Sequence, residues 1–121
     1  MTRFRIKRIY DPAEKSDGLR ILVDRLWPRG LKKEDAQIDL WFKEAAPSVD
    51  LRKWFDHDPD KWQEFKKRYI IELEGNKAIA NLLDRVKMSK TVTLLYAARD
   101  KEHNHSLVLQ GFLEENAAAE P

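Results

Sequence analysis

The chain has 121 residues, of which 42% are apolar and 36% are charged, and its formal net charge is +2. This length is typical of one domain with a single modest core. No apolar run approaches the roughly 18 residues of a membrane-spanning helix, and no apolar segment follows the basic N-terminal residues as in a signal peptide. We therefore expect a cytoplasmic protein with no membrane partner. Because cysteine is absent, disulfides, thiolate metal sites and a cysteine nucleophile are excluded.

The charges are distributed unevenly along the chain. Residues 1–33 contain ten basic and four acidic residues, whereas residues 34–74 contain seven basic and eleven acidic ones. A local positive field favours a phosphate or carboxylate ligand, but the overall charge is far below that of a dedicated nucleic-acid binder. We therefore expect an anionic small molecule as the partner and place nucleic acid second.

The first third of the chain predicts two strands joined by a loop. Residues 3–7 alternate basic and apolar side chains, which is typical of a strand with one exposed face. Asp11-Pro12 and Asp17-Gly18 are turn signals, and residues 11–18 between the strands are predicted to form a loop. Residues 20–25 then predict a second strand. The loop is too short for a convincing crossover helix, so the relative direction of these two strands stays open.

A helical turn and a third strand follow. Residues 32–36 predict the helical turn, and residues 38–43 alternate apolar and polar side chains as a strand that ends before Pro47. Ser48 is a favourable N-cap for a short helix that ends at about Phe55.

Two further helices are predicted in the middle of the chain. Asp58 is a good N-cap, and Pro59 suits the first helical position of a long helix that Gly75 ends. Asn76 can then cap a second helix. Its apolar positions recur at helical spacing and form one buried stripe.

The C-terminal third predicts the central strand and the last helix. Residues 91–98 are β-branched and apolar almost throughout, as in a strand that helices cover on both faces. After a polar loop, residues 106–115 predict a helix and residues 116–121 a flexible tail. Strands that alternate with helices predict a single α/β domain over residues 1–115. We expect a small three-layer domain in which helices flank a mainly parallel sheet of about four strands.

Three blocks of the sequence carry a family resemblance. They read DPAEKSDGLRILVDRLWPRG near the start, FKKRYIIEL in the predicted long helix and TVTLLYAARDKEHNHSLVLQGFL near the end. With these blocks, which span most of its length, the chain resembles the YeaO-like branch of the proteins called domain of unknown function 488. The resemblance implies a compact cytosolic α/β domain but no particular activity. The wider family usually carries cysteines around the last strand and the helix after it, so the resemblance implies that any cysteine-dependent chemistry is absent here.

The residues that follow the predicted strands form the candidate site. In open α/β sheets, ligands bind beyond the carboxyl ends of the strands, where several loops meet. We assign proton transfer to Asp24 and His105, and ligand binding to side chains that offer a charge, a hydrogen bond or a stacking face. The predicted ligand-binding residues are Arg25, Trp27, Arg29, Lys43, Arg68, Tyr69, Tyr96, Arg99 and Asn104.

Structural roles remain open for several of these residues. Asp24 and Arg25 equally fit structural ion pairs or anchors of the Pro28-Arg29-Gly30 turn, and Trp27 fits a core position. His103 and His105 have metal-binding spacing but no obvious third ligand, so we predict no metal. The sequence also lacks the common motifs for nucleotide and dinucleotide cofactors, and we predict no cofactor.

The leading functional prediction is an anion-binding pocket at the strand ends, in a protein that acts on a phosphorylated or nucleotide-like molecule. This prediction requires the loop after the second strand to lie close to Asn104 and His105. Whether the protein is an enzyme stays open. The alternative is a noncatalytic nucleic-acid-associated or regulatory module, and a third option is an interaction domain without a small ligand. The basic residues that would serve the alternative are Arg3, Arg5, Lys7, Arg8, Lys32 and Lys33.

Overall fold

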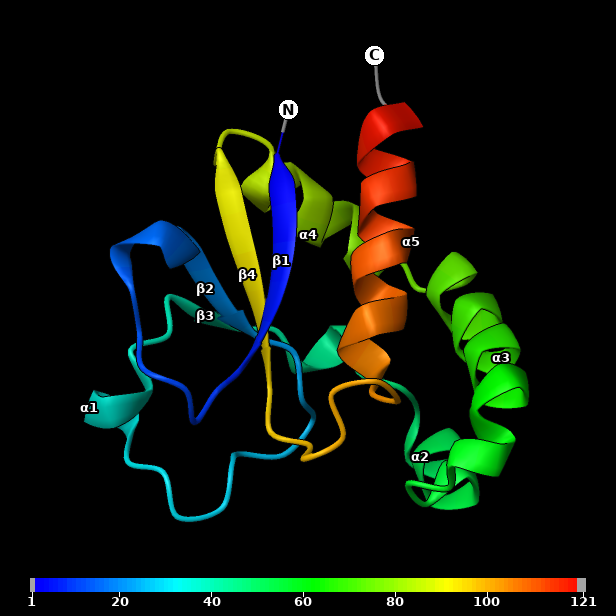
Figure 1. Cartoon of the computed structure of the whole chain (residues 1–121). Coiled ribbons are helices and arrows are strands. Elements are labelled where there is room, and N and C mark those ends of the chain that lie inside the picture. The colour runs from blue at the N-terminus through cyan, green and yellow to red at the C-terminus, as the bar shows by residue number, and fades with distance from the viewer. Residues whose placement is uncertain (1, 120–121) are drawn as a thin grey trace.

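The computed structural model of the chain describes residues 2–119. Its centre is a sheet of four parallel strands in the order β1–β4–β2–β3 (Figure 1). The strands are β1 (Arg3–Arg8), β2 (Leu19–Leu22), β3 (Leu40–Trp41) and β4 (Thr91–Tyr96). The predicted α/β domain with a parallel sheet of about four strands is confirmed, and β4 lies inside the sheet as expected. The direction of β1, which the sequence left open, is parallel to β4.

Helices cover the two faces of the sheet unequally. They are α1 (Lys33–Ala36), α2 (Val49–Phe55), α3 (Trp62–Glu74), α4 (Ala78–Val86) and α5 (His105–Ala119). In Figure 1, α5 stands beside β1, α3 lies on the far side of α5, and α1 lies apart from both helices. The main core contains residues of α2, α3, α4 and α5, whereas α1 contributes to a separate, smaller core. None of the helices in residues 2–119 has the length and apolarity to cross a membrane.

The strands alternate between the two cores. Ile21 and Leu94 belong to the main core, whereas Leu22 and Leu95 point the other way and pack with Ala36 of α1. All five side chains are fully buried. Because β2 and β4 are buried on both faces, their sequences are almost continuously apolar, as the sequence analysis predicted for β4.

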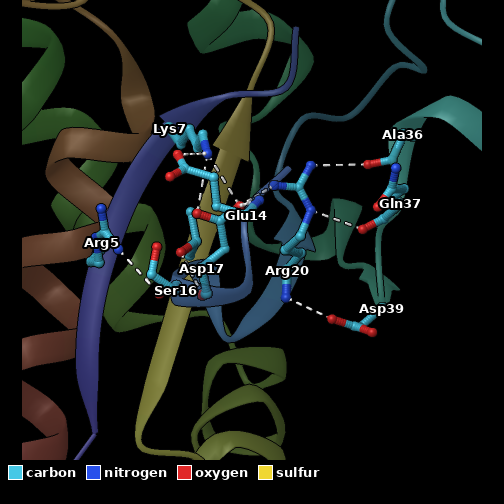
Figure 2. A network of polar contacts seen from close by, with 10 residues as sticks. Arg5, Lys7, Glu14, Ser16, Asp17, Arg20, Ala36, Gln37 and Asp39 are labelled. Atoms are coloured by element: carbon cyan, nitrogen blue, oxygen red, sulfur yellow. Dashed lines mark hydrogen bonds and ion pairs between the residues drawn. The ribbon is translucent and has the colours of Figure 1, made fainter. Parts of the chain in front are cut away.

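A buried ionic network holds the loop before β2 against the sheet (Figure 2). The Asp17 carboxylate, 1% exposed, accepts hydrogen bonds from Arg20 at 2.5 Å and from Lys7 at 3.2 Å. Arg20 also donates to two backbone carbonyls at the end of α1 and just after it. Burial raises the pKa of Asp17, but hydrogen bonds from the Glu14 backbone, Lys7 and Arg20 outweigh it and hold that pKa below its ordinary value. The network therefore joins β1, β2 and the α1 segment around one carboxylate.

Gly18 explains the turn at the start of β2. Its φ is +64°, and a Cβ atom at this position would lie 2.3 Å from the carbonyl oxygen of Thr91. Glycine is the residue that tolerates both this conformation and this approach of one backbone to another. The Asp17-Gly18 turn signal thus marks the place where β2 begins beside β4.

The predicted helix caps are present. Ser48 Oγ accepts a hydrogen bond from the Leu51 backbone N–H, and the Asp58 carboxylate accepts one from that of Asp60. The Asn76 side chain likewise accepts from the Ala78 backbone N–H. The segment after Asp58 first makes a 3₁₀ turn (Pro59–Lys61) and then continues as α3.

Two elements differ in length from their predictions. β3 has two residues rather than six, because residues 43–45 leave the sheet edge as a 3₁₀ turn. The buried Tyr69 hydroxyl donates to the Ala45 carbonyl oxygen and binds this turn to α3. At the other end of the chain, α5 continues to Ala119. It thus includes residues 116–119, which the sequence analysis assigns to a tail, while residues 120–121 lie outside the described residues.

Candidate functional site

A cavity of about 530 Å³ lies beyond the carboxyl ends of β2 and β4, and we call it the strand-end cavity. Most of its walls come from three parts of the chain, namely residues 24–29 after β2, residues 46–57 around α2, and residues 97–105 between β4 and α5. Figure 1 shows the connections that follow these parallel strands running along the same end of the sheet. This edge is where open α/β sheets bind their ligands.

Six of the predicted site residues line the strand-end cavity. They are Asp24, Arg25, Trp27, Arg29, Asn104 and His105. The His105 Nε2 atom lies 3.0 Å from the carbonyl oxygen of Val23, so the end of β2 touches the start of α5. The two segments meet because β2 and β4 are adjacent parallel strands. The expected proximity of the first loop to the last helix is therefore present.

The structure does not bring the other five predicted residues to this cavity. Tyr69 is buried in the main core, and Tyr96 is buried at the end of β4. Arg68 pairs with Glu64 and stacks on the ring of Trp54, 4.1 Å from its centroid. The remaining two, which are exposed, are Lys43 beside the Trp41 ring and Arg99 in the loop after β4. Position next to a strand end was a poor guide for Lys43, Tyr96 and Arg99, because it does not determine the direction in which a side chain points. Arg68 and Tyr69 were expected to close the site from the long helix, and α3 does not present them to this cavity.

Arg25 is anchored to the backbone of the segment before α2. Its Nη2 atom donates to the Pro47 carbonyl oxygen at 3.1 Å and to the Ala46 carbonyl oxygen at 3.4 Å. It makes no ion pair with Asp24, so the structural pair considered from the sequence is wrong. Arg25 instead holds one wall of the cavity in place.

Asp24 joins the ends of β2 and β4. Its Oδ2 atom accepts a hydrogen bond from the Ala97 backbone N–H at 2.9 Å. Its Oδ1 atom is buried 3.3 Å from His105 Nε2 and has no hydrogen-bond partner among the described residues. Burial raises the pKa of Asp24, although His105, the Ala97 N–H and Arg52 oppose this change. Asp24 is thus a desolvated carboxylate in the cavity wall.

His105 and Asn104 fasten the start of α5. Because the Val23 carbonyl oxygen, 3.0 Å from His105 Nε2, can only accept a hydrogen bond, Nε2 carries the ring hydrogen in this contact. The buried Asn104 amide donates to the Asp100 carbonyl oxygen at 2.9 Å and accepts a hydrogen bond from the Ser106 hydroxyl. These contacts are structural, and proton transfer by Asp24 or His105 stays a prediction.

Trp27 lies between core and cavity. Its Nε1 atom donates to the Leu31 carbonyl oxygen at 2.6 Å, and its ring meets that of Trp41 edge-on, with centroids 5.4 Å apart. It packs against the smaller core and also lines the strand-end cavity. The core position considered from the sequence is therefore present.

Three exposed cations in the cavity lining are unpaired. The side chains of Arg29, Arg52 and Lys53 make no hydrogen bond or ion pair within residues 2–119. Arg52 is close enough to Asp24 to lower the pKa of that carboxyl. Sequence reasoning missed Arg52 and Lys53, because nothing in the local pattern of α2 indicates that it lies against the strand ends.

All three histidines of the chain line the strand-end cavity. His57 follows α2 in a left-handed backbone conformation, with φ of +55°. The Nδ1 atom of His103 lies 2.9 Å from Asp100 Oδ2. Within residues 2–119, no group of three histidine or carboxylate side chains is placed to hold a metal ion.

A second, larger groove has the opposite charge. It lies mainly between α3 and α5, has a volume of about 810 Å³ and is lined by Glu74, Glu102 and Glu115 but only one cation, Lys66. The strand-end cavity is lined by four Arg and Lys side chains and by two carboxylates, which are Asp24 and Asp56. The sign of the charge therefore favours the smaller cavity for an anion.

Comparison with known proteins gives the family. A family model described as the inactive DUF488-N3 subclade matches residues 3–121. The chain is also 47% identical over 107 residues to the uncharacterized protein YeaO of Escherichia coli (strain K12), across 88% of this chain and 93% of YeaO. The chain is a YeaO-like member of the DUF488 family. The family resemblance stated from the sequence is therefore confirmed.

Mycobacterial relatives of this YeaO-like chain show a similar extent of match. The uncharacterized proteins Rv3073c of Mycobacterium tuberculosis (strain H37Rv) and Mb3100c of Mycobacterium bovis are each 40% identical to it over 112 residues. The match covers 93% of this chain and 94% of each relative. No solved structure matches the chain.

Proposed function

We propose that this protein binds an anionic small molecule, of a phosphorylated or nucleotide-like kind, in the strand-end cavity. The observation that carries the proposal is the gathering of three unpaired cations, Arg29, Arg52 and Lys53, around one cavity. Although Arg52 lies near Asp24, cations outnumber carboxylates in the lining, and such an excess gives a concave site a positive potential. A volume of about 530 Å³ lies within the usual range for small-molecule sites.

Three observations support binding without catalysis. The matching family model is described as an inactive subclade, and this chain has no cysteine for the cysteine chemistry that the wider family resemblance implies. In addition, Asp24 and His105 each already bind the backbone, through the Ala97 N–H and the Val23 carbonyl oxygen. In the catalytic version of the proposal, one of these two side chains moves a proton at the bound ligand.

The nucleic-acid alternative receives less support. Three of its basic residues, all in β1, are engaged within the protein. Arg5 donates to the Ser16 carbonyl oxygen, Lys7 pairs with Asp17, and Arg8 donates to the backbone carbonyls that follow β4. Binding of a nucleic-acid backbone depends on cations that are free to neutralise phosphates. Of its six basic residues, Arg3, Lys32 and Lys33 are the ones whose side chains make no hydrogen bond or ion pair within residues 2–119.

Thermal unfolding with added ligands tests the proposal. We expect inorganic phosphate, AMP and ribose 5-phosphate to raise the unfolding temperature, because a ligand that binds the folded state stabilises it by mass action. Uncharged adenosine should have little effect. The double variant Arg29→Ala, Arg52→Ala should lose most of the stabilisation by AMP.

The matched control is Arg85→Ala, which removes an exposed arginine of α4 that does not line the cavity. This variant should respond to AMP as the wild type does. Equal stabilisation of the wild type and the double variant would contradict the proposal, as would a wild type that none of the phosphorylated compounds stabilises.

A further inference from the structure

The loop between β4 and α5 is folded around the carboxylate of Asp100. Asp100 Oδ1 accepts hydrogen bonds from the backbone N–H groups of Glu102 and His103, at 2.9 and 3.0 Å. Its Oδ2 atom lies 2.9 Å from His103 Nδ1. The hydrogen bonds from the Glu102 backbone and the His103 ring hold the pKa of Asp100 below its ordinary value. An ionised carboxylate therefore faces the His103 ring at neutral pH.

This carboxylate determines which nitrogen of His103 is available to a ligand. An ionised carboxylate only accepts hydrogen bonds, so Nδ1 carries the hydrogen that lies between the two side chains. The ring also meets Trp62 edge-on, with centroids 5.5 Å apart at 88°. Nε2 has no partner within residues 2–119, although the side chain lines the cavity and is 29% exposed. His105 differs, because its Nε2 atom is bound to the Val23 carbonyl oxygen.

We propose that His103, positioned by Asp100, binds the phosphoryl oxygens of the ligand through Nε2 and makes the strand-end cavity a site for phosphate monoester dianions. The inference rests on the proposed function and deepens it. Donors reach the cavity from three elements, with Arg29 after β2, Arg52 and Lys53 on α2, and His103 before α5. A phosphate monoester presents three acceptor oxygens and close to two negative charges. A carboxylate presents two oxygens in one plane and a single charge, and it matches fewer of these donors.

The charges around His103 couple its protonation to anion binding. Asp100 and Glu102 belong to the same loop, and Lys66 reaches the Trp62 ring from α3. The same cavity is also lined by Asp24 and Arg25 after β2, by Arg52, Asp56 and His57 in and after α2, and by His105 of α5. The protonated ring offers Nε2–H as a charged donor to an anion in the cavity. An anion bound there stabilises the imidazolium, and by linkage the imidazolium increases the affinity for the anion.

A titration of the histidine rings in the wild-type protein tests this coupling directly. The three imidazoles are followed by long-range ¹H–¹⁵N NMR from pH 5 to 8, and His57→Gln and His103→Gln identify their signals. Sodium sulfate is the first probe, because it stays a dianion throughout this range, and AMP is the second. We expect sulfate to raise the protonation midpoint of His103 by about one pH unit, which equals tenfold coupling. A His103 midpoint that stays constant while sulfate binds would overturn the inference.

Substitutions distinguish a direct contact between His103 and the anion from a purely structural role of His103. Wild-type affinity for sulfate should be up to about tenfold higher at pH 5.5 than at pH 8, because a midpoint shift of one pH unit equals tenfold coupling. His103→Gln should remove most of this pH dependence, while His57→Gln should retain it. Asp100→Asn keeps an oxygen for the two backbone N–H groups but presents an amide N–H₂ to Nδ1. The neutral ring must then carry its hydrogen on Nε2, and the pH dependence should become smaller.

The outcomes also distinguish this inference from the proposed function. If Arg29→Ala with Arg52→Ala abolishes sulfate binding while His103→Gln leaves the pH dependence of the affinity unchanged, the cavity binds anions but His103 is not a ligand contact. If the wild type binds neither sulfate nor AMP, both proposals fail. A selective loss of pH dependence in His103→Gln, with unfolding temperature near that of the wild type, supports the inference.

Discussion

Arg25 and Arg29 lie four residues apart and have different surroundings. The Arg25 guanidinium binds the carbonyl oxygens of Ala46 and Pro47, both of which are buried residues, whereas the exposed Arg29 side chain has no partner within residues 2–119. The distinction between structural and ligand-binding arginines therefore rests on what each guanidinium contacts. Both side chains carry the same guanidinium group, so residue type alone does not distinguish the two roles.

This difference predicts opposite effects of two alanine substitutions. Arg25→Ala should lower the free energy of unfolding by roughly 1–3 kcal/mol, because it leaves buried carbonyl oxygens without a donor. Arg29→Ala should change it by less than about 0.5 kcal/mol, as at most exposed sites, while weakening AMP binding. Urea unfolding and calorimetric titration measure the two effects. A large loss of stability in Arg29→Ala, with Arg25→Ala unchanged, would reverse the assignment.

Asp24 predicts a specific pH dependence of stability. Burial raises its folded-state pKa above the ordinary value of 3.8, so the folded state binds this proton more tightly than the unfolded state does. The resulting stabilisation is complete below pH 3.8 and is lost as the pH rises through the folded-state value. The free energy of unfolding of the wild type relative to Asp24→Asn should therefore fall as the pH rises from about 4. Urea unfolding of both proteins from pH 4 to 7 checks this sign, and a constant difference would contradict it.

At the level of elements, the ionic network of Figure 2 connects β1, β2 and the segment that follows α1. Its centre, Asp17, is buried, whereas Glu14 at its edge is 63% exposed and binds the same lysine at 2.9 Å. Both acidic residues pair with Lys7, but Asp17 also pairs with the buried Arg20. Substituting each in turn compares the buried centre of the network with its exposed edge.

Asp17→Ala should destabilise the fold by roughly 3–5 kcal/mol, because it leaves Arg20, which is 5% exposed, without its buried counter-charge. Glu14→Ala should cost less than about 1 kcal/mol, since its ion pair faces solvent. Chemical unfolding of both variants at neutral pH measures the difference. Equal losses would show that burial does not determine the strength of this network.

At the level of the whole molecule, the balance of charge predicts weak binding of nucleic acid. Residues 34–121 contain 13 basic and 17 acidic residues, which oppose the basic first third of the chain. Fluorescence anisotropy with labelled duplex and single-stranded oligonucleotides should therefore show little binding at about 150 mM salt. Micromolar or tighter binding under these conditions would instead support the nucleic-acid alternative.

Much of the fold follows from local patterns in the sequence. The caps at Ser48, Asp58 and Asn76, the apolar stripes of the helices and the continuous apolar run of β4 are all visible within a few residues of one another. These features depend on backbone hydrogen bonding and side-chain period, which act at short range along the chain. The short β3 was missed, because its end is set by the distant contact between Tyr69 and Ala45.

The residues of the candidate site also fall into two groups, those placed correctly from the sequence and those that only the tertiary structure brings to the cavity. The loop after β2 and the start of α5 were placed correctly, because adjacent parallel strands bring their carboxyl ends to one edge. The contributions of Arg52, Lys53 and His57 depend on where α2 lies relative to that edge, and Arg25 acquires its role from carbonyl groups some twenty residues away. Local sequence determines which segments become helices and strands, whereas packing among distant segments decides which side chains share a cavity. Such contacts depend on the burial of whole faces and leave no pattern in any short stretch of the chain.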